Sequence, residues 1–220
     1  GQPRRLTFDG TFALAIRWSE DGKSILFSST RHQPHRNAAL FAVNVEGGAV
    51  RTLPLGQGFW TWSEAGGKGR VVGRHRYDLA RWKRYKGGLA GEIWIDADGN
   101  DEWSRLFADR TEGFANPIWQ DGRIWFLSDM QGYGNLFSSL PDGSDLRRET
   151  NPQGFFPRHL QTDGERFVYC LGGDVYCFDP GTSSSEKIAI DYASPRTHLA
   201  RKFVDATDYL DSIALHPKGH

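Results

Sequence analysis

The chain contains 220 residues, with 27 basic and 27 acidic side chains, so its formal net charge is zero. This balance argues against nucleic-acid binding driven by bulk positive charge. Hydrophobic residues make up 38% and aromatic residues 13% of the chain, which argues against global disorder, and no run approaches the ~18 apolar residues of a transmembrane helix.

Short hydrophobic runs, separated by Gly, Asp, Asn and Pro clusters, follow one another along the whole chain. They are rich in Val, Ile, Phe, Trp and Tyr, as in "SILFSS", "LFAVNV", "EIWIDA", "RIWFLSD", "RFVYC" and "DVYCFD". No sustained apolar pattern has the 3.6-residue spacing of a helix. The runs therefore predict an all-β fold.

The runs recur in a fixed order: a strand ending near Trp or Leu, an Asp-Gly or Gly-Gly turn, a hydrophobic strand, an aromatic strand and a basic-apolar strand. Four passes occur, at approximately residues 9–53, 59–106, 115–150 and 155–190, the last closing with "KIAI". A period of ~40–55 residues with about four strands per unit is typical of a β-propeller with four-stranded blades. An ordinary β-sandwich with similar hairpins is the alternative.

In the third pass, "IWQDGRIWFLSD", we expect Asp121 and Gly122 to form the turn between two strands. We expect Trp119, Ile124 and Phe126 to face neighbouring blades.

Both ends of the chain look like pieces of further blades. "PRRLTF" near the start resembles the basic-apolar strands that close the other units, and "LDSIALHPKG" near the end resembles a first strand. The chain does not begin with Met, and its only Met is Met130. We therefore expect an internal piece of a larger propeller, with residues 1–205 forming an incomplete propeller and residues 206–220 beginning a following propeller or blade.

A basic insertion lengthens the second unit, from Arg70 to Lys86, and contains only one acid, Asp78. Its candidate contacts to a peptide or partner are Arg74, His75, Arg76, Arg81, Trp82, Lys83, Arg84 and Tyr85. Exposed arginines would bind carboxylate or phosphate groups, and the aromatic rings would stack on cations or peptides. The alternative is structural: the arginines cover an aromatic patch and pair with acids of a neighbouring domain. Single-stranded nucleic-acid binding also uses such surfaces, but we expect no nucleic-acid partner.

Other motifs predict no catalytic or metal chemistry. The chain has no G-x-S-x-G nucleophile elbow. His32 and His35 lie in a polar loop without Cys or an acidic neighbour, and "DADGND" lacks the spacing of a calcium loop, so we interpret it as a β-turn. We expect no catalytic residue, no metal and no cofactor in this chain.

The two cysteines flank a Gly-Gly pair in "FVYCLGGDVYCF". If that pair forms the turn, Cys170 lies opposite Val175 and Cys177 opposite Val168. The cysteines are then diagonal neighbours roughly 7–8 Å apart, beyond the usual disulfide range of about 4.4–6.8 Å. We expect both thiols to be reduced, which favours the cytoplasm, although a one-residue slip of the hairpin would change the pairing.

The insertion, "VVGRHRYDLARWKRYKGGLAGEIWID", resembles the tricorn protease family. This resemblance is specific, because generic propellers lack such a segment. The resemblance continues through "IWFLSDMQGYGNLFSSLPDGSDLRRET" and "FFPRHLQTDGERFVYCLGGDVYCFDP" and covers essentially the whole chain. The "WSEDGKSILFSS" type of repeat is less specific, since TolB-like and oligopeptidase propellers share it.

This resemblance implies a large cytoplasmic serine peptidase that oligomerises and carries a six-bladed propeller, a seven-bladed propeller and downstream catalytic modules. The chain would form most of the six-bladed propeller, and its last residues would open the seven-bladed one. The catalytic Ser and His would lie in the later modules. The implied partners are peptides, catalytic domains of the same parent chain and further copies of the parent. The basic pair that the family uses for the substrate carboxylate would fall near Gly10 to Leu14, which is not basic, so that role is not carried over.

We therefore expect a non-catalytic propeller that channels or gates peptides for a catalytic site elsewhere in the parent chain. One alternative is a TolB-like stand-alone propeller that binds a protein partner. Another is the propeller lid of an oligopeptidase, which predicts G-x-S-x-G in a downstream α/β-hydrolase domain.

Overall fold

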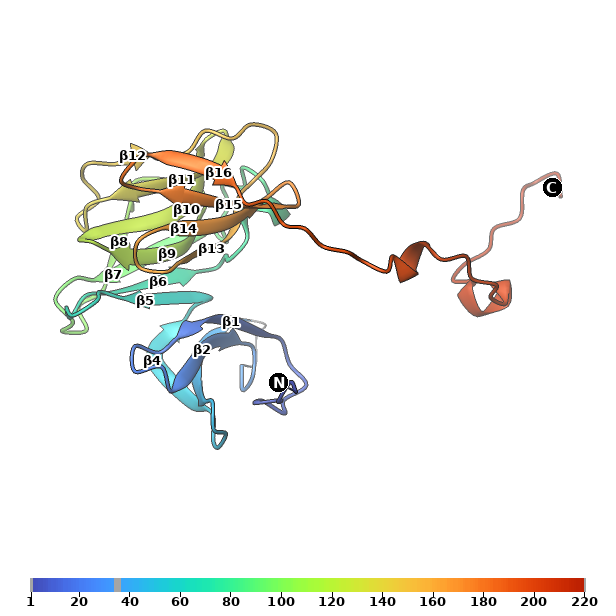
Figure 1. Cartoon of the computed structure of the whole chain (residues 1–220), viewed down its shortest axis with the longest axis horizontal. Coiled ribbons are helices and arrows are strands. Elements are labelled where there is room, and N and C mark those ends of the chain that lie inside the picture. The colour runs from blue at the N-terminus through green and yellow to red at the C-terminus, as the bar shows by residue number, and fades with distance from the viewer. Residues whose placement is uncertain (1, 34–36, 220) are drawn as a thin grey trace. The chain divides into compact units, whose positions relative to one another are not determined.

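The computed structural model describes residues 2–33 and 37–219. The chain divides into two compact units, Gly1–Ile188 and Ala189–His220. All the strands that the structure describes lie in the first unit, where they form four separate four-stranded sheets. The sheets follow one another along the chain, from blue β1 to orange β16 (Figure 1).

Each sheet is antiparallel, and its strands are neighbours in sequence order. The first sheet contains β1 (Ala13–Trp18), β2 (Ser24–Ser29), β3 (Ala39–Asn44) and β4 (Arg51–Gln57). The second contains β5 (Trp60–Ser63), β6 (Arg70–Arg74), β7 (Glu92–Asp96) and β8 (Ser104–Leu106). The third contains β9 (Phe114–Gln120), β10 (Arg123–Gln131), β11 (Tyr133–Ser139) and β12 (Arg147–Arg148). The fourth contains β13 (Arg158–Thr162), β14 (Phe167–Leu171), β15 (Asp174–Asp179) and β16 (Ser184–Lys187).

These sheets are the four predicted blades, so the all-β propeller prediction is confirmed. The closing strand of the fourth blade differs in detail: β16 ends at Lys187, where the predicted "KIAI" strand begins. The hairpin between β15 and β16 sets this register, since Asp179 pairs with Ser184 across a short turn.

The turn between β9 and β10 lies at Asp121 and Gly122, as predicted. Both residues have left-handed φ angles, 52° and 68°, which a tight two-residue hairpin requires at both central positions. Gln120 pairs with Arg123 across this turn.

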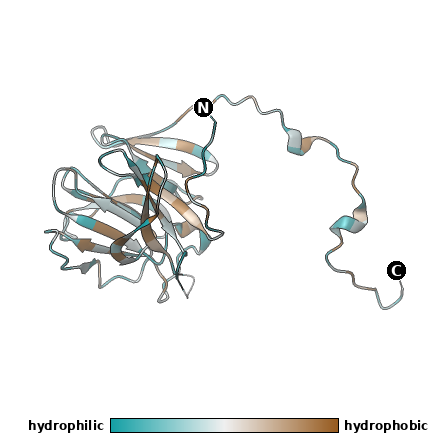
Figure 2. Cartoon of the chain, turned by 90° about the horizontal axis from the view of Figure 1, so that it is seen from below, coloured by the Kyte–Doolittle hydropathy of each residue, from teal (hydrophilic) through white to brown (hydrophobic). Residues whose placement is uncertain are grey.

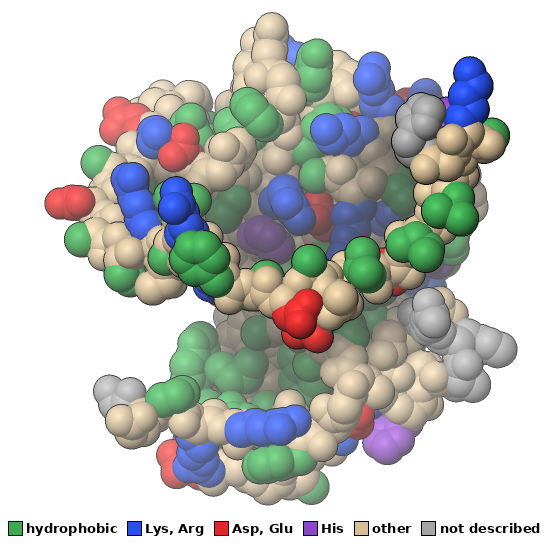
Figure 3. All heavy atoms as spheres, turned by 90° about the vertical axis from the view of Figure 1, so that its right-hand side faces the viewer, with side chains coloured by type: hydrophobic (Ala, Val, Ile, Leu, Met, Phe, Trp, Pro, Cys, Tyr) green, Lys and Arg blue, Asp and Glu red, His purple; other side chains and the backbone are tan. Residues whose placement is uncertain are grey.

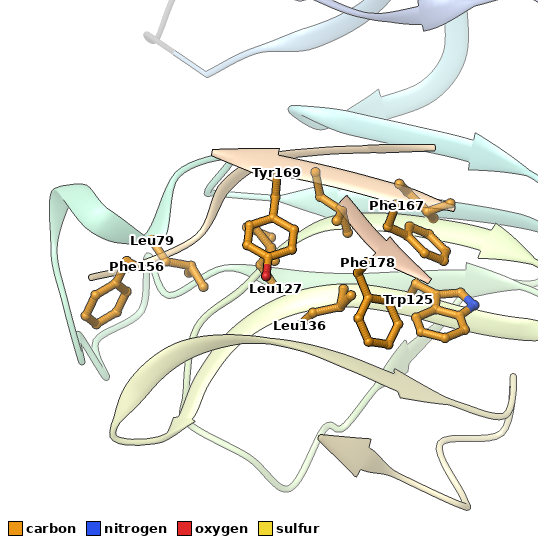
Figure 4. Packing of buried hydrophobic residues seen from close by; sticks show 11 residues of the cluster. Leu79, Trp125, Leu127, Leu136, Phe156, Phe167, Tyr169 and Phe178 are labelled. Carbon is orange, nitrogen blue, oxygen red and sulfur yellow. The ribbon is translucent and has the colours of Figure 1, made fainter. Parts of the chain in front are cut away.

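Hydrophobic side chains join neighbouring blades. A core cluster between the second and third blades contains Val71, Ile93, Ile95, Leu106, Phe114, Trp119, Ile124, Phe126 and Phe137. It includes the three residues of the third blade that were predicted to face neighbouring blades. A second cluster joins the third and fourth blades, where Trp125 packs on Phe167 with ring centroids 4.5 Å apart (Figure 4). Hydrophobic residues concentrate in the strands, and the connecting loops are mostly hydrophilic (Figure 2).

Three of the first strands carry irregularities that the repeat pattern does not predict. The ladder of β1 shifts between Ala15 and Arg17. In β9 and β13 the shifts occur at Asn116 and His159, whose φ angles are 51° and 58°. Bulges of this kind turn side chains and carbonyl groups away from the regular ladder. As a result, Gln161 Nε2 of β13 donates to the Ile16 carbonyl of β1 at 2.8 Å.

The cysteine hairpin has the predicted register: Cys170 pairs with Val175, and Cys177 with Val168. Both thiols are free.

The structure describes no strand in residues 2–12 or 189–219, so the partial blades expected at the two ends do not appear as paired strands. The second unit contains two short 3-10 helices, η2 (Thr197–Leu199) and η3 (Ala206–Tyr209). Among the described residues, no helix has the length and hydropathy needed to cross a bilayer.

Candidate peptide or partner contact site

The basic insertion connects β6 to β7 and contains one short 3-10 helix, η1 (Leu79–Arg81). Because the strands of each blade alternate in direction, this connection emerges at the end of the blades where the first strands begin. The insertion therefore lies near the starts of β5, β9 and β13, and its side-chain contacts agree with this position.

Asp78 fixes the insertion to the fourth blade. Its side chain is only 1% exposed and forms an ion pair with Arg158 at the start of β13. The same carboxylate accepts a hydrogen bond from the Ala80 amide at 3.0 Å and so caps η1. The next residue, Leu79, packs into the core between the third and fourth blades, near Phe156 (Figure 4).

Asp129, near the end of β10 in the third blade, binds the backbone of the insertion through its side chain. Its carboxylate accepts hydrogen bonds from the Arg84 amide at 2.6 Å and from the Gly113 amide at 3.3 Å. Burial raises the pKa of Asp129 above its ordinary range, against the lowering effect of these two amides. Nearby, Lys86 Nζ lies 3.5 Å from a Glu112 carboxylate oxygen.

Tyr77 links the insertion to the first two blades. Its ring centroid lies 6.0 Å from that of Phe12, just before β1, and 5.5 Å from that of Phe59, just before β5. The insertion thus contacts residues beside the first strands of all four blades.

The insertion returns to the second blade at Gly91. A Cβ atom at this position would lie 1.9 Å from the Phe114 carbonyl oxygen. The Gly91 carbonyl in turn accepts a hydrogen bond from the Phe114 amide at 3.1 Å. The close approach of the two backbones requires glycine here.

Three of the predicted contact residues are held against the second blade. The Arg74 guanidinium lies 4.5 Å from the Trp94 ring centroid, and His75 Nε2 lies 3.6 Å from a Glu92 oxygen. Arg76 donates from Nε to the Leu89 carbonyl at 3.1 Å, and burial lowers the pKa of its guanidinium.

Arg76 also packs against the two aromatic residues of the predicted contact set, Trp82 and Tyr85. Its guanidinium lies 3.8 Å from the Trp82 ring centroid and 5.3 Å from that of Tyr85. Trp82 nevertheless remains 53% exposed. These contacts agree with the structural alternative for Arg74 and Arg76, in which arginines cover aromatic rings.

The remaining cations of the predicted set are exposed. Arg81 lies over the Tyr77 ring at 5.6 Å and Lys83 over the Phe156 ring at 5.4 Å. Arg84 has a left-handed φ of 55°, which places its amide toward Asp129. Within residues 2–33 and 37–219, none of these three side chains forms an ion pair. With Trp82, they form an exposed surface that we call the insertion rim: Arg81, Trp82, Lys83 and Arg84.

On the face shown in Figure 3, Lys and Arg side chains occur in separate places among hydrophobic and acidic ones. Among the described residues, no group of three or more His, Cys, Asp or Glu side chains has the arrangement of a metal site. His32 is exposed, and the other histidine of its pair, His35, lies outside the described residues.

Sequence reasoning did not identify Asp129 and Arg158 as anchors of the insertion. Their positions relative to Arg84 and Asp78 depend on how the blades are arranged around one another. The sequence signal for the role of Asp129 was the Ser-Asp pair at the end of the third blade's hydrophobic strand. In the structure, Ser128 Oγ donates to the Gly113 carbonyl at 2.8 Å, and the Asp129 carboxylate accepts from the Gly113 amide.

Comparison with known proteins agrees with this architecture. The chain matches the family model of the tricorn protease N-terminal beta propeller domain over residues 1–184. It is 39% identical over 186 residues to tricorn protease homolog 1 of Streptomyces coelicolor, a match that covers 81% of this chain and 17% of that protein. A crystal structure of the tricorn protease superposes with a TM-score of 0.75 at 34% identity and covers 84% of this chain and 18% of that one. The chain therefore spans less than a fifth of the length of these proteins.

A propeller of another kind is similar in fold only. TolB from Acinetobacter baumannii superposes with a TM-score of 0.61 at 16% identity, covering 84% of this chain and 45% of that one. The family match, in contrast, extends through the whole insertion and the first strands of all four blades. The chain belongs to the tricorn protease N-terminal β-propeller family.

Proposed function

We propose that this chain is a non-catalytic propeller domain of a cytoplasmic, tricorn-like serine peptidase and that it channels or gates peptides for a catalytic site elsewhere in the parent chain. The observation that carries this proposal is the insertion rim, which presents beside an exposed Trp82 three exposed cations that form no ion pair with any residue that the structure describes. The insertion that bears the rim is anchored by contacts beside the first strands of four blades.

Peptides suit this surface chemically. Guanidinium and ammonium groups bind carboxylates, and Arg forms bidentate hydrogen bonds with them. An exposed indole offers apolar area to a passing side chain at a small loss of conformational entropy. The remaining implied partners are catalytic domains of the same parent chain and further parent copies. The two free thiols are compatible with a reducing compartment.

The proposal is tested in the full-length parent protein by replacing Arg81, Lys83 and Arg84 with Ala. We expect a lower kcat/KM for peptides and a weaker dependence of kcat/KM on salt concentration, because surface charges that attract a substrate are screened by ions. Unchanged kcat/KM and salt dependence would leave the insertion with a structural role only.

A matched control removes three cations at the opposite end of the blades. Lys23, Lys68 and Arg166 are exposed and lie in the turns between first and second strands. Their replacement by Ala changes the net charge by the same amount, so kcat/KM should fall less than with the rim variant. An equal fall would indicate a general charge effect.

The TolB-like alternative is distinguished by the gene that encodes the chain. A peptidase module several hundred residues downstream supports our proposal, and a stop codon soon after His220 contradicts it. The chain alone should also leave a fluorogenic peptide intact.

A further inference from the structure

A recess of about 700 Å³ lies between the outer strands of the third and fourth blades. Residues 148–153, at the end of β12 and in the connection that follows it, line one side. Residues of β14, β15 and β16 line the other side. The recess shares no residue with the insertion rim, so its role is independent of the proposed function.

β16 is the outermost strand of the fourth blade and has a partner strand on one side only. The Ile188 amide donates to the Val175 carbonyl at 2.8 Å, which sets the alternation of the antiparallel ladder between β15 and β16. Ser185 and Lys187 therefore point their amides and carbonyls away from β15. These groups form no backbone hydrogen bond with any residue that the structure describes, so the edge presents two free donors and two free acceptors.

The outer edges of the other three blades are less suited to a further strand. β8 has three residues and β12 has two. β4 is longer, but it contains Pro54, which has no amide proton, and its ladder with β3 is irregular. β16 combines four extended residues with an adjoining recess.

The side chain of Ser185 lies on the face of β16 that is turned toward the third blade. Ser185 pairs with Phe178, which belongs with Tyr169 to the core cluster between the third and fourth blades (Figure 4). The Ser185 hydroxyl lies 2.6 Å from that of Tyr169, and the Tyr169 ring stacks on that of Tyr176 with centroids 5.8 Å apart. A strand beside β16 would therefore direct every second side chain toward this aromatic pair.

Apolar side chains continue the lining of the recess. Leu171, Pro152 and Phe155 contribute to it, and Phe155 is 58% exposed. The Phe155 ring lies over the turn between β14 and β15, where a Cβ atom at Gly172 would be 3.1 Å from it. The recess thus offers apolar surface next to the free strand edge.

Most charges of the recess already have partners within the chain. Lys187 Nζ lies 2.8 Å from an Asp174 oxygen. Glu149 Oε1 accepts a hydrogen bond from Ser138 Oγ at 2.5 Å. Arg148 is exposed and forms no ion pair with any described residue. Because one charge among these remains unpaired, the recess suits a ligand that has polar backbone groups and no strong charge of its own.

We propose that β16 and this recess bind an extended peptide segment of uncharged residues, which adds to the fourth blade as one further strand. The backbone of the segment pairs with Ser185 and Lys187, and its alternate apolar side chains lie against Tyr176, Leu171 and Phe155. In this mode of recognition the backbone hydrogen bonds give affinity, and the pockets for alternate side chains give specificity. The segment is internal to its chain, so no terminal carboxylate takes part.

The test uses the 220-residue chain and the capped peptide Ac-Thr-Leu-Thr-Leu-Thr-NH2, which carries no charge. Amide hydrogen exchange is followed by NMR at increasing peptide concentration. Exchange of the Ser185 and Lys187 amides should slow in a saturable way. The Glu186 amide, which faces β15, should change little.

Two N-methylated forms of the peptide are matched controls. An added strand turns only every second amide toward β16. Methylation of the two leucine amides and methylation of the second and third threonine amides should therefore differ. One pattern should weaken binding at least about tenfold, and the other by less than about threefold. These peptides test the wild-type chain and do not depend on the folding of a variant.

Ser185→Pro tests the same edge from the side of the protein. It removes an outward amide, and an edge strand accommodates proline where the amide faces solvent. Ser185→Ala also loses the hydroxyl contact with Tyr169 but keeps the amide. We expect the proline variant to bind the peptide at least about fivefold more weakly than the alanine variant.

The proposal is overturned by unchanged exchange up to about 10 mM peptide, by equal effects of the two methylation patterns, or by equal binding of the two Ser185 variants. Exchange at Ser185 and Lys187 that slows with chain concentration alone, and does not respond to the peptide, would also overturn it. That result would identify a second copy of the chain as the occupant of the edge.

Discussion

Replacing Gly91 with Ala tests whether the insertion is held against the third blade by backbone contact. A Cβ atom at this position would lie 1.9 Å from the Phe114 carbonyl oxygen, whereas ordinary van der Waals contact begins at 3.4 Å. One of the two backbones must therefore move by about 1.5 Å, the difference between these distances. Such a movement breaks the hydrogen bond from the Phe114 amide to the Gly91 carbonyl.

Two effects set the expected loss of stability. Overpacking of a well-packed site costs about 1–3 kcal/mol, and the lost hydrogen bond contributes about 0.5–1.5 kcal/mol. We expect Gly91→Ala to lower the free energy of unfolding by about 2–4 kcal/mol, close to the combined range of these two effects. For a domain of this size, each kcal/mol corresponds to about 2–4 °C in Tm.

Urea denaturation followed by tryptophan fluorescence measures this loss, with Gly88→Ala as the matched control. A Cβ atom at Gly88 would meet nothing within 4 Å, and this glycine has no left-handed φ. The control should therefore stay within about 0.5 kcal/mol of the wild-type chain. Equal stabilities of the two variants would refute the close packing of the insertion against the third blade.

Two further predictions concern the anchors of the insertion. Leu79→Ala should lower the free energy of unfolding by about 2–5 kcal/mol, because a buried side chain is removed from the core between the third and fourth blades. Leu199→Ala, at an exposed position, is the control, and equal losses would contradict the anchoring role. Burial raises the pKa of Asp129, so the folded chain keeps this proton where the unfolded chain has released it. The free energy of unfolding therefore falls as pH rises through the interval between the unfolded and the folded pKa. Urea titrations from about pH 4 to pH 7 should show this fall in the wild-type chain and not in Asp129→Asn, and parallel profiles would contradict it.

The strands could be predicted from the sequence because each is bounded by local signals. The "DVYCFD" run, for example, starts after Gly173 and ends before Pro180, and β15 occupies the same six residues. The prediction was less accurate at β16, where Ser184 and Ser185 have weak strand propensity. Pairing with β15 across a short turn determines that strand.

The sequence predicted which segment contains the candidate site, but it did not predict how the side chains of that segment are arranged. Its composition showed that the cations of the insertion outnumber its acids. Which of them remain exposed depends on contacts distant in sequence, such as the pairing of Asp78 with Arg158.

The hydrogen bond from Gln161 to the Ile16 carbonyl has a mechanical consequence. The four sheets share no strand, so this contact joins the first and fourth blades by a side chain and not by a common sheet. One such bond contributes about 0.5–1.5 kcal/mol, far less than the many backbone bonds within a blade. Because this single side-chain bond is weak, β1 and β13 can separate reversibly while every sheet keeps its own backbone hydrogen bonds.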